Sequence, residues 1–232
     1  ASHVPVVFDQ PERFMREAFH EERDELDLVH DVGKVTNDSR EYLLNIARSA
    51  NEASSQVRQA WENYSSPVDY GVNSLDLPKV VSLIDAGMPT KLYYVSYRNN
   101  AFDTHVFQNN VHRRLLTYTS DAVFAFLQDL ERIGRADDVA LMIFSEFGRR
   151  VPENDNLGTD HGAANNMFVV GNQVKGGHYG ELPSLTKLNP EDNLAYTTDF
   201  RRVYQTVIEG WLGHRGSGEL LGGNYQPFDM FA

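Results

Sequence analysis

A short apolar segment, residues 139–145, constrains the fold of this chain more than any other part of its sequence. It contains β-branched and aromatic side chains and stops abruptly at Glu146, which is the pattern of a buried β-strand. A second apolar segment spans residues 167–170, and the polar loop before it carries Asp160 and His161. The sequence therefore predicts two strands joined by a loop rich in ionisable groups.

Helical patterns precede and follow these two strands. The other predicted elements are helices over 75–86, 111–130 and 198–212 and a strand over 91–97. Helices and strands that alternate along a chain predict an α/β fold, in which a partly parallel sheet carries flanking helices on its faces.

The first seventy residues have a different character. Residues 10–61 are charged, with apolar residues at three- and four-residue intervals, and this pattern predicts two helices with a break near Gly33. A Ser-Ser-Pro turn at 65–67 separates them from the rest of the chain. We expect a helical segment over residues 1–70 that packs on the core, followed by an α/β part over residues 71–232.

Composition excludes several classes of function. The chain has 33 acidic and 21 basic residues, a net charge of −12 that repels nucleic acid and anionic membranes, so no nucleic-acid partner is expected. It has no cysteine, which excludes disulfides, thiolate metal sites and cysteine nucleophiles. No apolar stretch approaches the roughly eighteen residues that a membrane span needs.

Polar side chains follow the ends of the predicted strands. Asp103 and His105 come after the strand over 91–97, Glu146 closes the next strand, and His161 lies on the loop that follows. In open α/β sheets ligands bind outside the carboxyl ends of the strands, so these side chains should converge. Their oxygen and nitrogen atoms suit zinc, manganese, magnesium or calcium. The sequence predicts a divalent metal site there.

Each of these residues, taken alone, also has a simpler interpretation. A loop Asp or His is usually a solvated turn residue or a cap. Asp160 could bind the ion or only orient a histidine. Glu146 could pair with Arg149 or Arg150 instead of a metal, and the two arginines could also bind an anionic oxygen.

Several segments resemble known protein families. The chain resembles a family of exported bacterial proteins called domain of unknown function 1501. The resemblance lies in five motifs that occur in the family's order: FDTH, SEFGR, TDHG, YTTDFRRVYQTVIEGWLG and LLGGNYQPF. The order NNAFDTH, FQNNVHRRLL to LQDLERIG, LMIFSEFGRR and GTDHG resembles the carboxyl-terminal half of the alkaline phosphatase superfamily, which includes sulfatases. The resemblance covers the chain well from residue 75 onward.

The resemblance implies roles for the polar residues. Enzymes of this superfamily hold two metal ions, and Asp103, His105 and His161 match the ligands of the first. Glu146 matches the Asp of the Asp-His pair that belongs to the second ion, although an alternative alignment makes Asp160 and His161 that pair. We prefer Glu146, since it directly follows the strand.

Two departures from the superfamily pattern bear on the chemistry. Asp103 and His105 are two residues apart rather than the usual four, and Phe147 stands where the second pair has its histidine. Since phenylalanine cannot bind a metal, the second ion site is weakened or absent, and chemistry with two metal ions is not assumed.

The superfamily nucleophile has no match in this chain. It is a Ser, Thr or formylglycine near the amino terminus, and the Ser-Ser-Pro at 65–67 lacks the Arg that follows in sulfatases. We therefore expect this chain to be the carboxyl-terminal portion of a longer protein. The amino-terminal portion, or another chain, would complete a sulfatase-like sheet whose edge is otherwise left uncovered.

The function implied by the resemblance is a metal-dependent hydrolase of phosphate or sulfate esters. Its cofactor would be a divalent zinc, manganese or calcium ion at Asp103, His105 and His161. The alternative is a degenerate member that serves as a binding or structural module. The resemblance also implies export to the periplasm by the twin-arginine route, which carries folded chains, and the absence of cysteine fits that route.

Overall fold

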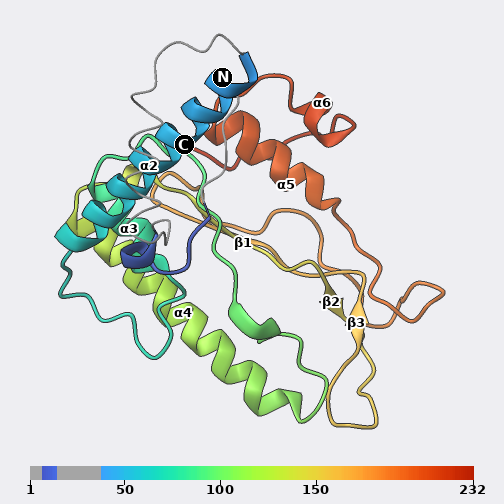
Figure 1. The fold of residues 1–232 in the computed structure, drawn as a ribbon. Coiled ribbons are helices and arrows are strands. Elements are labelled where there is room, and N and C mark those ends of the chain that lie inside the picture. Colours follow the sequence, from blue (N-terminus) through green and yellow to red (C-terminus); the bar gives the residue numbers. More distant parts are fainter. Residues whose placement is uncertain (1–6, 15–37) are drawn as a thin grey trace. The chain divides into compact units, whose positions relative to one another are not determined.

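Helices and short antiparallel strands make up the described part of the chain, residues 7–14 and 38–232 of a computed structural model (Figure 1). This confirms the predicted mixture of α and β structure. The chain divides into two compact units, one formed by Ala1–Pro67 and Asp76–Tyr94 and the other by Val68–Leu75 and Val95–Ala232.

The first unit is helical. Its described residues form the short helix η1 (Pro11–Arg13) and the helices α2 (Asp38–Asn63) and α3 (Leu77–Asp85). Val57 and Ala60 of α2 and Leu83 of α3 form its buried core. The second of the two predicted amino-terminal helices is thus confirmed as α2. The first of them, and the break near Gly33, lie outside the described residues.

Helix α3 shows ordinary helix signals at both ends. A proline occupies its first turn, where the missing N–H has no intrahelical partner to lose. Gly87, with φ of 70°, follows the last turn and stops the helix, because glycine adopts this left-handed conformation at little cost. The predicted helix over 75–86 is confirmed.

In the second unit, the long helix α4 (Gln108–Arg132) follows the short helix η2 (Arg98–Asn100) and precedes η3 (Ala136–Asp138). Its side chains at Ala122, Ala125, Phe126 and Leu130 are buried at three- and four-residue spacing, as the amphipathic pattern predicts. Asp129 is fully buried on the same helix, where it accepts a hydrogen bond of 2.8 Å from the Tyr70 hydroxyl.

The strands form one interrupted antiparallel ribbon. Strand β1 (Leu141–Ile143) pairs with β4 (Phe168–Val170), and β2 (Gly148–Arg149) pairs with β3 (His161–Gly162). Figure 1 shows β2 and β3 farther along the ribbon that begins at β1. Paired residue numbers sum to 311 in the first section (141 and 170) and to 310 in the second (148 and 162). One extra residue therefore lies between the two sections on the β3–β4 side, as in a β-bulge.

The predicted parallel pairing of these strands is wrong. The connection from β2 to β3 is a loop without a helix, and such a loop returns the chain antiparallel, whereas a parallel pair needs a crossover of a dozen or more residues. No parallel pair occurs among residues 7–14 and 38–232.

The predicted strand over 91–97 is also wrong, because these residues form no ladder within the part of the chain that the structure describes. Side-chain exposure alternates from Tyr93 to Tyr97, as in a strand. Alternation fixes which side chains are exposed, but it does not supply the neighbouring strand that a ladder requires.

The carboxyl-terminal region is helical at its start. Asp199 caps α5 (Phe200–Thr206) by accepting a hydrogen bond from the Arg201 amide. The helix continues into the π-helical turn η4 (Val207–Trp211), and α6 (Ser217–Leu221) follows. The predicted helix over 198–212 is confirmed. Among the described residues, no helix has an apolar stretch long enough to cross a bilayer.

Replacing Tyr70 by Phe should lower the free energy of unfolding by about 1–3 kcal/mol, because the buried Asp129 carboxylate loses a hydrogen bond where water cannot replace it. Urea denaturation measures the change. The control is Tyr196→Phe, since Tyr196 is 67% exposed and its variant should differ from the parent by less than about 0.5 kcal/mol. Equal stability of the two variants would contradict the role assigned to Tyr70.

Candidate metal centre

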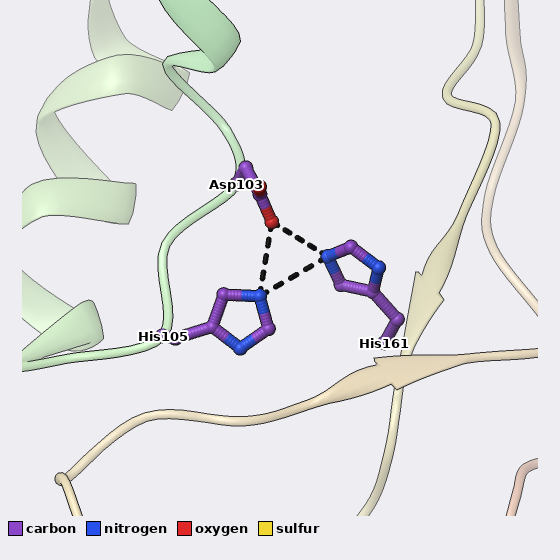
Figure 2. A group of neighbouring side chains, drawn as sticks. All are labelled: Asp103, His105 and His161. Carbon is purple, nitrogen blue, oxygen red and sulfur yellow. Dashed lines mark hydrogen bonds and ion pairs between the residues drawn. The ribbon is translucent and has the colours of Figure 1, made fainter.

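Three side chains that the sequence analysis singled out lie together. The Oδ1 atom of Asp103 is 2.9 Å from Nε2 of His105 and 2.6 Å from Nε2 of His161, and the two Nε2 atoms are 3.2 Å apart (Figure 2). Asp103 and His105 come from the loop between η2 and α4, and His161 comes from β3. The convergence of these three side chains is therefore as expected.

The donor set fits a divalent ion. Four ligands placed tetrahedrally at about 2.0–2.1 Å from zinc are about 3.3 Å from one another. The separation of 3.2 Å between the Nε2 atoms of His105 and His161 matches that spacing. The Asp103 oxygen lies closer than this to both nitrogens, at hydrogen-bond distance, and would move outward by well under 1 Å to join them.

The three ligand candidates are also accessible and in a suitable charge state. Their side chains are 39% exposed for Asp103 and His105 and 44% for His161. Hydrogen bonds from His161 and then His105 lower the pKa of the Asp103 carboxyl below its usual value. Asp103 is thus ionised at neutral pH, as a metal ligand must be.

The loop before α4 and the loop between β2 and β3 are joined through their backbones. The Phe107 amide donates to the Asn156 carbonyl at 2.9 Å, and the Gln108 amide donates to the Leu157 carbonyl at 3.0 Å. Phe107 and Leu157 have φ of 46° and 60°, a left-handed conformation that is costly for a residue with a side chain. These two strained residues lie at the backbone hydrogen bonds that join the loops, close to His105 and the β-ribbon.

Glycines allow the backbones to approach at this contact. A Cβ atom at Gly158 would overlap the carbonyl oxygen of His105, and one at Gly148 would overlap the carbonyl oxygen of Ala164. Gly162, paired with Gly148 in the ribbon, would likewise meet the backbone of Arg149. Only a residue without a side chain fits at these positions.

Arg149 holds the ligand-bearing segments to each other. Its guanidinium donates at 2.6 Å to the carbonyl of Phe102, one residue before Asp103, and at 2.6 Å to the carbonyl of Thr159, two residues before His161. Desolvation lowers the pKa of Arg149, partly offset by the charges of Asp103 and Asp160. The Arg149 guanidinium thus donates mainly to backbone oxygens of the two segments.

Glu146 lies outside the cluster. Its side chain is exposed, and among the described residues it makes no hydrogen bond or ion pair, either with Arg149 or with Arg150. The Arg150 guanidinium donates to the carbonyl of Glu191 at 2.7 Å instead. Because this carboxylate is exposed at the strand end, water solvates it and no arginine partner is required.

Phe147 contacts the ligand candidate His161 directly. The two rings are stacked, with centroids 3.8 Å apart and planes inclined by 13°. Asn165 donates to the Phe147 carbonyl at 2.9 Å, across the interruption of the ribbon. Phe147 thus packs against a ligand candidate and restricts the orientation of its ring.

Asp160 lies beside a histidine, although not the one that follows it in sequence. Its Oδ1 atom is 3.5 Å from Nδ1 of His105, on the opposite side of that ring from Asp103. The Asn154 side chain, which sequence reasoning did not single out, donates to Asp160 and is the first cause that lowers the pKa of its carboxyl. Asn154 and Gly158 were missed because the loop residues NDNLG indicate only a turn.

The part of the chain that contains this site matches a known family of sequences. A family model described as a protein of unknown function (DUF1501) matches residues 83–207, more than half of the 232 residues, and this range contains every residue of the site. The chain therefore belongs to the DUF1501 family, as the sequence motifs indicated. Neither the curated proteins nor the solved structures contain a match to the chain.

Gly158→Ala should lower the free energy of unfolding by about 1–3 kcal/mol, because the new methyl group would push the loop away from the His105 carbonyl. Chemical denaturation of the variant gives the value. The matched control is Gly176→Ala, since a Cβ atom at Gly176 has nothing within 4 Å. A Gly158→Ala variant as stable as the Gly176→Ala variant would show that the close approach is not required.

Proposed function

We propose that this chain binds one divalent metal ion, zinc, manganese or calcium, through Asp103, His105 and His161 and serves a metal-dependent hydrolase of phosphate or sulfate esters. The observation that carries this proposal is the cluster itself, in which one carboxylate oxygen and two imidazole nitrogens lie within 4.8 Å of one another at an exposed position. Three protein ligands are the number found in catalytic zinc sites, where a further position stays open for water or substrate.

The residues of the chain have distinct tasks in this proposal. Asp103 contributes the negative charge, and the two imidazoles contribute neutral nitrogen donors. Phe147 restricts the ring of His161, and Arg149 keeps the loops of Asp103 and His161 together. A divalent ion held there would polarise an ester oxygen and favour attack by a nucleophile.

The remaining parts of the proposal come from the superfamily resemblance. We assign the nucleophile, a Ser or Thr, to an amino-terminal portion of the same protein or to another chain that completes a sulfatase-like sheet. The mixed α/β structure of the described residues is compatible with such a sheet. Among the described residues, each section of the ribbon has two strands, which leaves outer edges for further strands to pair with.

A second candidate function is supported by two residues. Phe147 cannot bind a metal, and Glu146 lies apart from the cluster, so the described residues offer ligands for one ion where the superfamily enzymes hold two. A member with a single ion could act as a non-catalytic binding or structural module. The two candidates share the metal site and differ in whether the intact protein hydrolyses esters.

Metal-free protein titrated with zinc should bind one ion per chain by calorimetry. Asp103→Asn, His105→Gln and His161→Gln should each lose most of the affinity, since each removes a ligand. Glu146→Gln is the matched control and should bind as the parent does.

The outcomes separate the candidates. Parent protein that takes up no zinc, manganese or calcium would overturn the metal site, and loss of the ion in Glu146→Gln would restore Glu146 as a ligand. Hydrolysis of nitrophenyl phosphate or sulfate by the intact protein, abolished in Asp103→Asn, supports the hydrolase. Metal uptake without hydrolysis of any ester supports the binding module.

Export is the last element of the proposal, and it rests on the resemblance to exported bacterial proteins. The precursor should begin with a twin-arginine signal, and fractionation of the producing cells should place the protein in the periplasm. Because that route carries folded chains, the protein should still reach the periplasm in cells that lack periplasmic disulfide formation, in keeping with its lack of cysteine. Recovery in the cytoplasmic fraction would contradict this assignment.

A further inference from the structure

The ring of His105 lies between two carboxylates. Its Nε2 atom faces Asp103 at 2.9 Å, and its Nδ1 atom faces Oδ1 of Asp160 at 3.5 Å. A neutral imidazole has one N–H and one lone pair, and the hydrogen bond made by one nitrogen decides which nitrogen keeps the proton. Without an ion, the Asp103 carboxylate favours a proton on Nε2 and the Asp160 carboxylate favours one on Nδ1. For Nε2 to serve as a metal ligand, the proton of His105 must reside on Nδ1.

The side-chain amide of Asn154 contacts both Asp160 and the backbone of His105. Its Nδ2 atom donates to Oδ1 of Asp160 at 3.2 Å and to the carbonyl of His105 at 3.1 Å. Its Oδ1 atom accepts from the amides of Asn156 and Gly158, both at 3.0 Å. The donor end of the amide thus contacts the site, and the acceptor end maintains the turn.

We propose that Asn154 is a positioning residue of the metal site, which holds the Asp160 carboxylate beside Nδ1 of His105 so that Nε2 presents its lone pair to the ion. This inference rests on the proposed metal-binding function. Carboxylates that accept a hydrogen bond from the distal nitrogen of a metal-binding histidine fix its tautomer, and their loss typically costs 10–100-fold in affinity. Here Asp160 is exposed, so it needs a second contact to stay beside the ring.

The substitution Asn154→Asp tests the donor end alone. The new carboxylate keeps an oxygen that can accept from Asn156 and Gly158, so the turn is retained. It replaces the donating NH₂ group by an oxygen that repels Asp160. The matched control is Asn172→Asp, because Asn172 donates to Oδ1 of Asp137 at 3.0 Å at a site that contains no ligand candidate.

Zinc affinity of Asn154→Asp should fall about 10–100-fold, and that of Asn172→Asp should stay at the parent value. Because Asn154 acts through Asp160, the double variant Asn154→Asp, Asp160→Ala should lose little more affinity than Asp160→Ala alone. Independent, additive losses would overturn the proposal, as would an unchanged affinity in Asn154→Asp.

Nitrogen-15 chemical shifts of the His105 ring give a readout that a merely structural role would not move. At a pH where the imidazole is neutral, the fraction protonated at Nδ1 should be lower in Asn154→Asp than in the parent or in Asn172→Asp. An equal fraction in all three proteins would refute the positioning role. If the parent binds no ion, the proposed function fails, and the same shifts in metal-free protein still decide whether Asn154 sets the tautomer.

Discussion

The rest of the site depends on the hydrogen bonds that the Arg149 guanidinium donates. It donates to backbone oxygens of two segments that lie far apart in sequence, the carbonyls of Phe102 and Thr159. The ligand candidates Asp103 and His161 follow these carbonyls within two residues. A lysine has a single ammonium in place of the planar guanidinium and could not reach both carbonyls with the same geometry. The relative position of the ligand candidates is therefore set by the backbone and by one side chain.

The antiparallel ribbon supplies the geometry around this guanidinium. Because β2 and β3 are paired, Arg149 lies opposite His161, so the guanidinium-bearing residue and the ligand candidate are neighbours by register. Close backbone contacts at Gly148 and Gly162 keep this part of the ribbon narrow. The loop at the end of the ribbon then packs on the start of α4 through two backbone hydrogen bonds. Local pairing, rather than a large buried core, thus builds the site.

The sequence predicted the helices well and the strand pairing poorly, for a physical reason. Periodicity reports which side chains are buried, and α4 shows its buried face at the expected spacing. Periodicity carries no information about which strand pairs with which. The parallel pairing was predicted from the alternation of helices and strands along the chain. Asp103, His105 and His161 were still expected to meet, although the cause is an antiparallel ribbon that folds back onto the loop before α4. Asn154 could not be foreseen, since its role depends on where Asp160 lies in space.

The contact between Asp103 and His161 has a further consequence, because these residues are 58 positions apart in sequence. Ligands so far apart that hold the same ion close a long loop of chain. A closed loop has fewer conformations when unfolded, and the chain-entropy estimate for a covalent link of this length is about 4 kcal/mol. In this chain, which has no cysteine, an ion bound at the proposed site would take the place that a disulfide has elsewhere. The stabilisation from this loop closure would be reversible, because it would depend on the concentration of the metal ion rather than on an oxidant.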